Sequence, residues 1–468
     1  MPSMGCVCIR IFAQAAAKLP TIRSYMRLSQ MNPSRVLRFA GCFLVVMGAV
    51  LPHEAAAKVP ARHRAHQTQR KQHAPYKLGA RLPAAAAKGV VNIKAGGDQS
   101  VTATAATVPK LPVLTRAEIL DTEPERLTRI GQHVIIGFHE FSTLRTLVEK
   151  KAIAGIFITT HNVAGHTAAQ IKDEIDALQD IRKRQGLSPL IIAADQEGGQ
   201  VSRLSPPLKK QQSLARALAG SKDDEARRKI VEDYAAVQAS ELKRIGVTVN
   251  FGPVVDLNLA NAKREDGETM LRQRAIAADP YLVTKAAGWY CATLAKAGIM
   301  CTLKHFPGLG RVARDTHVAS GDISASEGLL ELNDWVPFRR LMNRANVATM
   351  LGHVRVAVID KETPASFSKP VIGQLIRQTW EHDGLLITDD FSMGAISGSK
   401  DGVGGAAVKS INAGADLILV SFSEKYLDPV LSALIRADEE GALDAKITQA
   451  SRARIARILR DTRDGGDN

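Results

Sequence analysis

Asp315 and His317, an aspartate and a histidine two positions apart, have the spacing of a proton-transfer pair. Side chains two apart in an extended segment point the same way, so the carboxylate can accept a hydrogen bond from one imidazole nitrogen and orient the other. A histidine held in this way can donate and accept a proton near neutral pH. The pair follows Lys304 and His305, which come directly after the apolar run 299–303, but these four residues alone name no reaction.

Two adjacent aspartates, Asp389 and Asp390, follow another apolar run at 385–388. A carboxylate at the tip of a rigid strand suits nucleophilic attack. Neighbouring side chains on a strand point to opposite sides, so only one of the two can face a common site. The residues themselves do not choose between them.

A third polar group follows the apolar run 190–194. Asp195 ends this run, and Arg203 lies eight residues further on, beyond a pair of glycines. A carboxylate can accept hydrogen bonds from two hydroxyl groups, and an arginine offers a planar fork of donors, so both suit a sugar ligand. The alternative is that Asp195 forms a salt bridge with an arginine at the strand end.

These groups stand at the ends of apolar runs that alternate with helix-period stretches. Strand–helix alternation repeated eight times predicts a (β/α)8 barrel of the TIM type, in which the site lies at the C-terminal ends of the strands. An open doubly wound sheet is the alternative, but no Gly-x-Gly-x-x-Gly follows the first run. The predicted strands lie at 133–138, 155–160, 190–195, 247–254, 299–304, 347–353, 385–389 and 416–422, and the clearest helices at 168–184, 224–245, 280–297, 368–381 and 403–413.

The segment Lys-His-Phe-Pro-Gly-Leu-Gly at 304–310, followed by Asp-Thr-His at 315–317, resembles the signature loop of bacterial family 3 glycoside hydrolases of the β-N-acetylglucosaminidase type. The resemblance covers nearly all of residues 115–460 and implies the same barrel. It implies a retaining exo-enzyme that acts on peptidoglycan-derived or related glycans and needs no metal or organic cofactor. The family pattern of a strand ending in Ser/Thr-Asp selects Asp389 as the nucleophile. It makes His317, oriented by Asp315, the acid/base, and leaves Asp390 a capping or supporting role.

The same resemblance assigns the sugar-binding residues. Asp195 is expected to bind the hydroxyls of the N-acetylglucosamine ring, Arg203 to support it, and Lys304 and His305 to donate to further hydroxyls. The family motif here is Asp-Gln-Glu-Gly-Gly-Arg, and Gln200 departs from its arginine.

One arginine assignment has a rival. The family usually shows Gly-Asp-Arg-Ser-Phe-x-x-Asp-Pro where this chain has Arg-Gln-Arg-Ala-Ile-Ala-Ala-Asp-Pro at 272–280, which places the sugar-binding arginine on Arg274. Arg272 remains possible because Arg272-Gln273 replaces Gly-Asp. We expect Asp256, nearby, to be structural, and His353 to stand in the wall of the site.

Positive charge is concentrated at the N-terminal end of the chain. Residues 1–112 hold 16 Lys and Arg against two acidic residues, or +14 of the total +15, which leaves +1 for residues 113–468. This distribution argues against a nucleic-acid-binding barrel. The partner that the resemblance implies is a carbohydrate, and we expect a monomer.

The first 112 residues show two kinds of sequence. Arginines before an apolar run at 39–51, and Ala55-Ala56-Ala57 after it, predict a secretory signal peptide cleaved near Ala57 and hence export to the periplasm or beyond. Residues 58–112 are rich in Ala, Pro and basic residues and predict a disordered linker, with weak attraction to the anionic cell envelope as a hypothesis. The predicted organisation is an N-terminal extension with signal peptide at 1–57, the linker at 58–112 and a catalytic domain at 113–468.

Two cysteines, Cys291 and Cys301, fall in the predicted catalytic domain. Buried free thiols are the first expectation and a disulfide in an oxidising compartment is the alternative. Three other functions also remain open on the sequence: a β-N-acetylglucosaminide phosphorylase, another family 3 β-glycosidase, and a barrel that binds cell wall without catalysis.

Overall fold

The computed structural model describes residues 112–260, 267–421 and 424–463. The predicted extension and signal peptide at 1–57, and nearly all of the linker at 58–112, lie outside these ranges. Within the ranges, no helix has both the length and the apolar character that a bilayer crossing requires.

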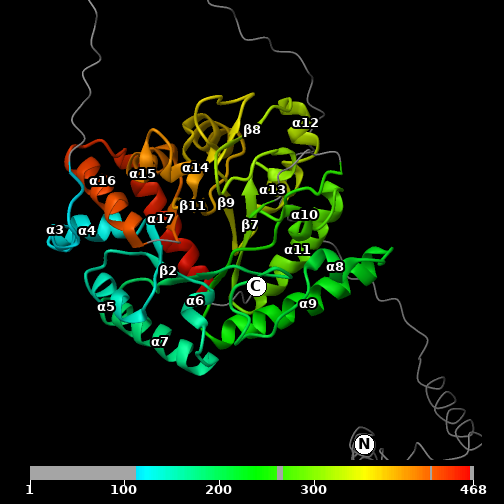
Figure 1. The fold of residues 1–468 in the computed structure, drawn as a ribbon, viewed down its shortest axis with the longest axis horizontal. Coiled ribbons are helices and arrows are strands. Elements are labelled where there is room, and N and C mark those ends of the chain that lie inside the picture. The colour runs from blue at the N-terminus through cyan, green and yellow to red at the C-terminus, as the bar shows by residue number, and fades with distance from the viewer. Residues whose placement is uncertain (1–111, 261–266, 422–423, 464–468) are drawn as a thin grey trace, which may run out of the picture. The chain divides into compact units, whose positions relative to one another are not determined.

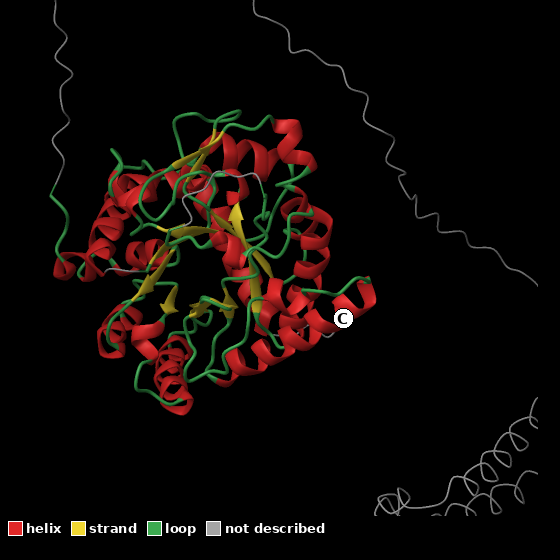
Figure 2. Ribbon diagram, turned by 45° about the vertical axis from the view of Figure 1, so that its right-hand side comes forward, coloured by secondary structure: helices red, strands yellow, loops and turns green. Residues whose placement is uncertain are grey.

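Eight parallel strands close into a barrel in the order β1, β12, β11, β9, β7, β6, β3, β2 (Figures 1 and 2). Each coincides with one of the eight predicted runs, so the predicted (β/α)8 barrel is confirmed. The strands are β1 Val134–Gly137, β2 Gly155–Ile158, β3 Ile191–Ala194, β6 Val249–Asn250, β7 Met300–Phe306, β9 Val347–Leu351, β11 Leu386–Asp390 and β12 Leu417–Val420.

Helices surround the barrel, as Figure 2 shows in red around the yellow strands. The longer ones are α5 Phe141–Glu149, α7 Ala168–Arg184, α9 Asp224–Arg244, α11 Pro280–Lys296, a π-helix at Pro370–Thr379, α15 Gly402–Ala413, α16 Leu427–Glu439 and α17 Ala445–Arg463. The shorter ones are α3 Arg116–Leu120, α4 Pro124–Gly131, α6 Thr160–Val163, α8 Leu214–Leu218, α10 Leu271–Arg274, α12 Glu327–Leu332, α13 Val336–Leu341 and α14 Gly394–Ser397.

Local sequence explains where two of the longer helices, α7 and α11, begin. The Thr167 hydroxyl accepts from the backbone N–H of Gln170, whose side chain in turn accepts from the Thr167 N–H, so a capping box starts α7. Asp279 caps α11, and Pro280 follows at the first helical position, where a missing N–H costs nothing. Both starts lie where the apolar pattern placed them.

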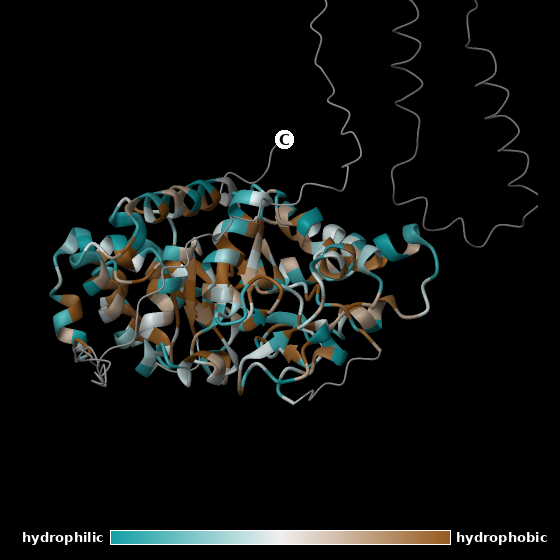
Figure 3. Cartoon of the chain, turned by 90° about the horizontal axis from the view of Figure 1, so that it is seen from above, coloured by the Kyte–Doolittle hydropathy of each residue, from teal (hydrophilic) through white to brown (hydrophobic). Residues whose placement is uncertain are grey.

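Two apolar clusters hold the fold together. One fills the inside of the barrel with alternate strand residues such as Phe157, Phe251, Met350 and Ile387. The larger one packs the outward-facing strand residues against the helices. Figure 3 shows apolar segments gathered in the middle and polar residues on the outer helices. The barrel is thus a packed core that leaves its upper rim for the site.

Cys291 of α11 and Cys301 of β7 form a disulfide, with Cα atoms 5.3 Å apart. The expectation of buried free thiols was therefore wrong, and the alternative applies. α11 runs back against the barrel and β7 follows it after a short turn, so a pair ten residues apart in sequence comes within bonding range. The bridge ties α11 to the strand that carries Lys304 and His305.

Three excursions from the strand ends build the rim. After β3, strands β4 Gln196–Gly198 and β5 Val201–Ser202 form a hairpin. After β6, the chain passes to α10. After β7, it makes a 3₁₀ turn at Leu309–Arg311 and then strand β8 Gly321–Ile323, which pairs with β10 Val354–Val356 beyond the barrel. The polar residues that the sequence singles out lie on these excursions or on the strand ends below them.

Candidate active site

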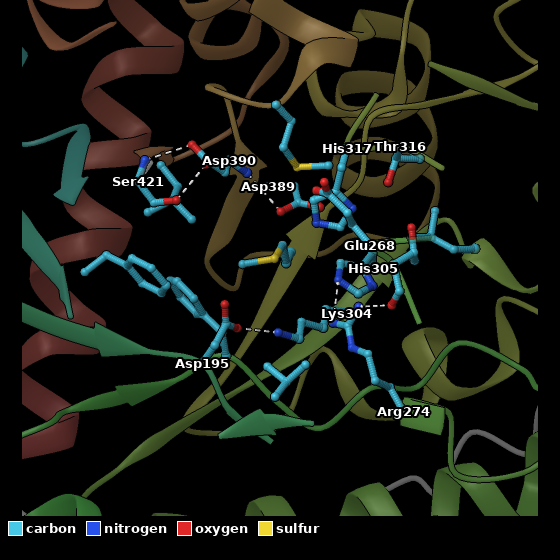
Figure 4. Close-up of a pocket in the computed structure, with 18 of the residues that line it drawn as sticks. Asp195, Glu268, Arg274, Lys304, His305, Thr316, His317, Asp389, Asp390 and Ser421 are labelled. Carbon is cyan, nitrogen blue, oxygen red and sulfur yellow. Dashed lines mark hydrogen bonds and ion pairs between the residues drawn. The ribbon is translucent and has the colours of Figure 1, made fainter. Parts of the chain in front are cut away.

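A pocket opens at the C-terminal ends of the barrel strands and holds about 640 Å³ of empty space including its mouth. Seven of the eight predicted site residues line it: Asp195, Arg203, Arg274, Lys304, His305, His317 and Asp389. Figure 4 shows most of these side chains turned toward one space. The eighth, Asp315, lies behind His317.

Asp389 is half-buried at the end of β11 and faces the pocket. One of its oxygens accepts a hydrogen bond of 2.9 Å from the backbone N–H of Asp390. Burial alone would raise the pKa of Asp389, but the imidazoles of His305 and His353 and this N–H outweigh it and bring the pKa below its ordinary value. Asp389 is therefore an ionised carboxylate near neutral pH, as a nucleophile requires.

Asp390, its neighbour, is buried and engaged with the protein. It accepts from the backbone N–H and hydroxyl of Ser421, at 2.8 and 2.6 Å, and from both groups of Ser392. Figure 4 shows it turned toward Ser421. Burial outweighs these hydrogen bonds and raises the pKa of Asp390. The geometry fits a residue that ties β11 to the end of β12.

His317 and Asp315 form a hydrogen-bonded pair on the loop after β7. His317 Nδ1 lies 2.9 Å from Asp315 Oδ1, and Thr269 donates its hydroxyl to that oxygen and its N–H to the other, at 2.6 and 3.0 Å. Burial would raise the pKa of Asp315, but these hydrogen bonds hold it well below its ordinary value. An ionised Asp315 only accepts, so Nδ1 of His317 carries the proton and Nε2 is left for the pocket.

Four charged side chains form an ion cluster at the base of the pocket: Asp195, Glu197, Arg274 and Lys304. Lys304 Nζ lies 2.5 Å from Asp195 Oδ1 and 2.6 Å from Glu197 Oε1. The Arg274 guanidinium donates two hydrogen bonds to the Glu197 carboxylate, of 2.9 and 2.7 Å. Two positive charges therefore meet two negative ones in a site where Lys304 is 2% exposed. Carboxylates, and not a ligand alone, offset the burial of these cations.

The ion cluster sets the protonation of its members. Burial by itself would raise the pKa of Glu197, but Arg274 and Lys304 lower it to about 2. Burial would lower the pKa of Lys304, and Asp195 and Glu197 raise it instead. Glu197, Arg274 and Lys304 are thus charged at neutral pH, and one oxygen of Asp195, which is 25% exposed, remains open toward the pocket.

His305 is oriented by Asp256, which is fully buried. Asp256 accepts from His305 Nδ1 at 2.7 Å and also from the backbone N–H groups of His305 and Leu309, at 3.2 and 2.7 Å. The expected structural role of Asp256 therefore has a concrete form. It fixes the ring so that Nε2 of His305 points toward Arg274 Nη2, 3.5 Å away.

Three further predicted residues are placed as follows. Arg203 lines the pocket, and no ion pair holds its guanidinium among the described residues; the partner of Asp195 is Lys304, not an arginine. Arg274 lines the pocket, whereas Arg272 is exposed on a different surface groove. His353 is fully buried behind β11, bonded to Ser366 and to the Asp390 carbonyl, so it supports the pocket instead of lining it.

Sequence reasoning missed Glu197, Glu268 and Thr269. Glu197 stands two residues after Asp195 in an extended segment, and this spacing could have placed both carboxylates on one side. Glu268 and Thr269 both line the pocket, next to the segment 261–266 outside the described ranges. No local sequence pattern predicts that Glu268 and Thr269 belong to the site. Thr269, for example, binds Asp315, which lies 46 positions further along the sequence.

The rim of this (β/α)8 barrel combines an ionised strand-end carboxylate with an Asp–His pair. Together they offer the nucleophile and the proton donor that a retaining glycoside hydrolase needs. Comparison with known proteins specifies the family. Residues 127–458 match the family model described as "Glycosyl hydrolase family 3 N terminal domain". The chain belongs to this family. It is an enzyme of the glycoside hydrolase class, and its substrate is a carbohydrate.

Individual relatives agree with this membership. The chain is 30% identical to beta-hexosaminidase LpqI of Mycobacterium tuberculosis over 80% of this chain and 95% of that one. It is 34% identical to a beta-hexosaminidase of Xylella fastidiosa over 63% of this chain and 84% of that one. Among solved structures, a family 3 beta-N-acetylglucosaminidase from a Paenibacillus strain superposes with a TM-score of 0.66 at 31% identity. The match covers 73% of this chain and 63% of that protein.

Proposed function

We propose that the protein is a retaining exo-β-N-acetylglucosaminidase. The observation that carries the proposal is that ionised Asp389 and the free nitrogen of His317 meet at one pocket above the ion cluster. The relatives named beta-hexosaminidase and beta-N-acetylglucosaminidase support the choice of sugar.

In the first step, a carboxylate oxygen of Asp389 attacks the anomeric carbon and the bond to the leaving oxygen breaks. His317, with both nitrogens protonated, transfers its Nε2 proton to that oxygen, so the aglycone departs as an alcohol. In the second step, the now neutral imidazole takes a proton from water, whose oxygen attacks the anomeric carbon and releases Asp389. Two displacements return the sugar with its original configuration.

The sugar would lie between these groups and the ion cluster. Asp195 accepts from hydroxyls with its open oxygen, and Lys304 and Arg274 supply donors at the pocket base. His305, whose Nδ1 donates to Asp256, offers its Nε2 as an acceptor beside them. Arg203, whose guanidinium is not engaged by a carboxylate of the described residues, adds a donor at the side. Each role follows from the hydrogen-bonding capacity of the group. No step in this scheme calls on a metal or an organic cofactor.

The natural substrate is proposed to be a peptidoglycan-derived or related glycan, and the enzyme to be exported. The predicted signal peptide supports export, and the Cys291–Cys301 disulfide adds an independent argument, because such bonds persist in oxidising compartments. N-terminal sequencing of the mature protein, expected to start near Lys58, tests this. A mature chain that keeps the apolar run 39–51 would contradict cleavage of the signal.

The activity is tested with 4-nitrophenyl β-N-acetylglucosaminide followed by proton NMR. The expected first product is the β-anomer of free N-acetylglucosamine, formed at the same rate with and without inorganic phosphate. The α-anomer as first product would contradict a retaining mechanism. Formation of a sugar phosphate would favour phosphorolysis, which a histidine acid/base permits because its neutral form repels an incoming anion less than a carboxylate does. A parallel assay on the β-glucoside, expected to be a poor substrate, separates this proposal from a general family 3 β-glycosidase.

A further inference from the structure

Thr269 lies between the two working parts of the pocket. It is buried on the chain segment that leads from β6 to α10, and it uses both backbone groups and its hydroxyl. The hydroxyl and the N–H donate to the two oxygens of Asp315, at 2.6 and 3.0 Å, and the carbonyl accepts from Arg274 Nη1 at 2.8 Å. One residue therefore contacts both the Asp–His pair and the ion cluster.

These contacts complete a continuous line of hydrogen bonds across the rim. From Asp195 it passes through Lys304 to Glu197, on to Arg274 and the Thr269 carbonyl, and ends at Asp315 and His317. The line joins groups on the excursions after β3, β6 and β7. Within the described part of the chain, the only hydrogen bonds to the Asp315 carboxylate come from Thr269 and from His317 itself. Among the described residues, Thr269 is thus the one that binds the Asp315 carboxylate from outside the Asp–His pair.

The segment before Thr269 also lies against Asp315. A Cβ atom built on Gly267 would stand 3.0 Å from Asp315 Oδ2, closer than most side chains tolerate. The chain at 267–269 therefore wraps closely around this carboxylate. A loop residue that is held from one side by His317 and from the other by this segment has little freedom to turn.

We propose that Thr269 is a positioning residue that holds Asp315, and through it His317, in the orientation for proton transfer, and that it ties this orientation to the sugar-binding arginine. The inference rests on the proposed function, because it assumes that His317 is the acid/base. Loss of the hydroxyl frees one side of Asp315 and lets the imidazole turn. The contact of Arg274 with the Thr269 carbonyl belongs to the backbone and survives the substitution.

The test compares two aryl β-N-acetylglucosaminides, one with a phenyl and one with a 2,4-dinitrophenyl leaving group. Protonation matters for the poor leaving group and little for the good one, and general acid catalysis is worth roughly 10²–10⁴-fold. Thr269→Val should lower kcat/KM about 10–100-fold on the phenyl glycoside and less than about 3-fold on the dinitrophenyl glycoside. Thr269→Ser, which keeps the hydroxyl, should restore the phenyl activity to within about 3-fold.

Two further variants guard against misfolding. Gly267→Ala presses on Asp315 from an exposed position and should give a smaller loss with the same dependence on the leaving group. Thr302→Val removes the hydroxyl of another buried threonine, one that lies outside the pocket and has no hydrogen-bond partner among the described residues, and should leave both activities unchanged.

The possible outcomes distinguish a wrong role for Thr269 from a wrong function for the enzyme. A wild-type enzyme that hydrolyses both glycosides, with Thr269→Val equally impaired on both or unimpaired on phenyl, would overturn the role of Thr269 and leave the proposed function intact. A wild-type enzyme inactive on both would overturn the two together. A loss confined to the phenyl glycoside and relieved by Thr269→Ser supports the proposal.

Discussion

Asp389 and Asp390 are adjacent in β11 and have opposite surroundings: Asp389 faces the pocket with a lowered pKa, and Asp390 is bound to Ser392 and Ser421 with a raised one. Strand geometry turns the two side chains apart. Only Asp389 is therefore available to a substrate. Substitutions of the two aspartates should consequently have different effects on activity.

Asp389→Ala should abolish turnover of an aryl β-N-acetylglucosaminide, with kcat lower by about 10⁴-fold or more, because it removes the carboxylate proposed to form the covalent intermediate. Asp390→Asn should keep much of the activity and lower the melting temperature, since the Ser421 and Ser392 contacts are only partly retained. Steady-state kinetics and thermal unfolding of both variants provide the check. An active Asp389→Ala protein would remove it from the role of nucleophile.

His317→Ala should lower kcat/KM on poor leaving groups by about 10²–10⁴-fold and affect 2,4-dinitrophenyl substrates much less. Azide added to this variant should raise its turnover and yield a glycosyl azide of β configuration, because an anion needs no base to attack the intermediate. NMR of the product distinguishes the two anomers. A loss of equal size on all leaving groups would speak against proton transfer by His317.

Glu197→Gln should destabilise the protein by about 3–5 kcal/mol, because it leaves Arg274 and Lys304 with one carboxylate for two buried cations. It should also raise KM, since both cations are proposed to bind the sugar. Glu232→Gln, which breaks only an exposed pair with Arg228, is the control and should cost less than about 1 kcal/mol. Urea unfolding of the two variants measures the difference, and equal stabilities would contradict a structural role for the ion cluster.

The Cys291–Cys301 disulfide should stabilise the fold by about 2–3 kcal/mol. A variant with both cysteines replaced by alanine should melt at a lower temperature and no longer respond to reductant, whereas the wild type should lose stability when reduced. Thermal unfolding with and without dithiothreitol shows this directly. Two free thiols in the untreated protein, produced in an oxidising compartment, would refute the bridge.

His382 makes the fold sensitive to acid. Burial lowers its pKa from 6.5 to about 3, and Nδ1 is bonded to Asn343. The unfolded state binds this proton below pH 6.5 and the folded state does not, so stability should fall by up to about 1.4 kcal/mol per pH unit from 6.5 down to 3. Unfolding measured across this range should be less steep for His382→Asn than for the wild type. His166→Asn, at an exposed histidine, should leave the slope unchanged.

The positions of the eight barrel strands could be predicted from the sequence, because each strand is a buried apolar run of its own, closed by a polar end. The candidate residues of the pocket could be placed for the same reason, since strand ends of a barrel converge. Three of the four members of the ion cluster, Asp195, Arg274 and Lys304, could be predicted from the sequence, and Glu197 could not. Pairings such as Arg274 with Glu197, 77 positions apart, exist only after the barrel has closed.

The loop after β7 and the wall of the barrel play different parts in this architecture. The proposed nucleophile belongs to β11, a strand bonded on both sides. His317 instead lies on an excursion that leaves the barrel after Phe306 and carries strand β8, which pairs with β10 from the segment after β9. Exchange of residues 308–320 would therefore leave every barrel strand in place. This segment is therefore suited to redesign, because new proton donors or a new shape of the pocket entrance can be introduced while the barrel strands stay the same.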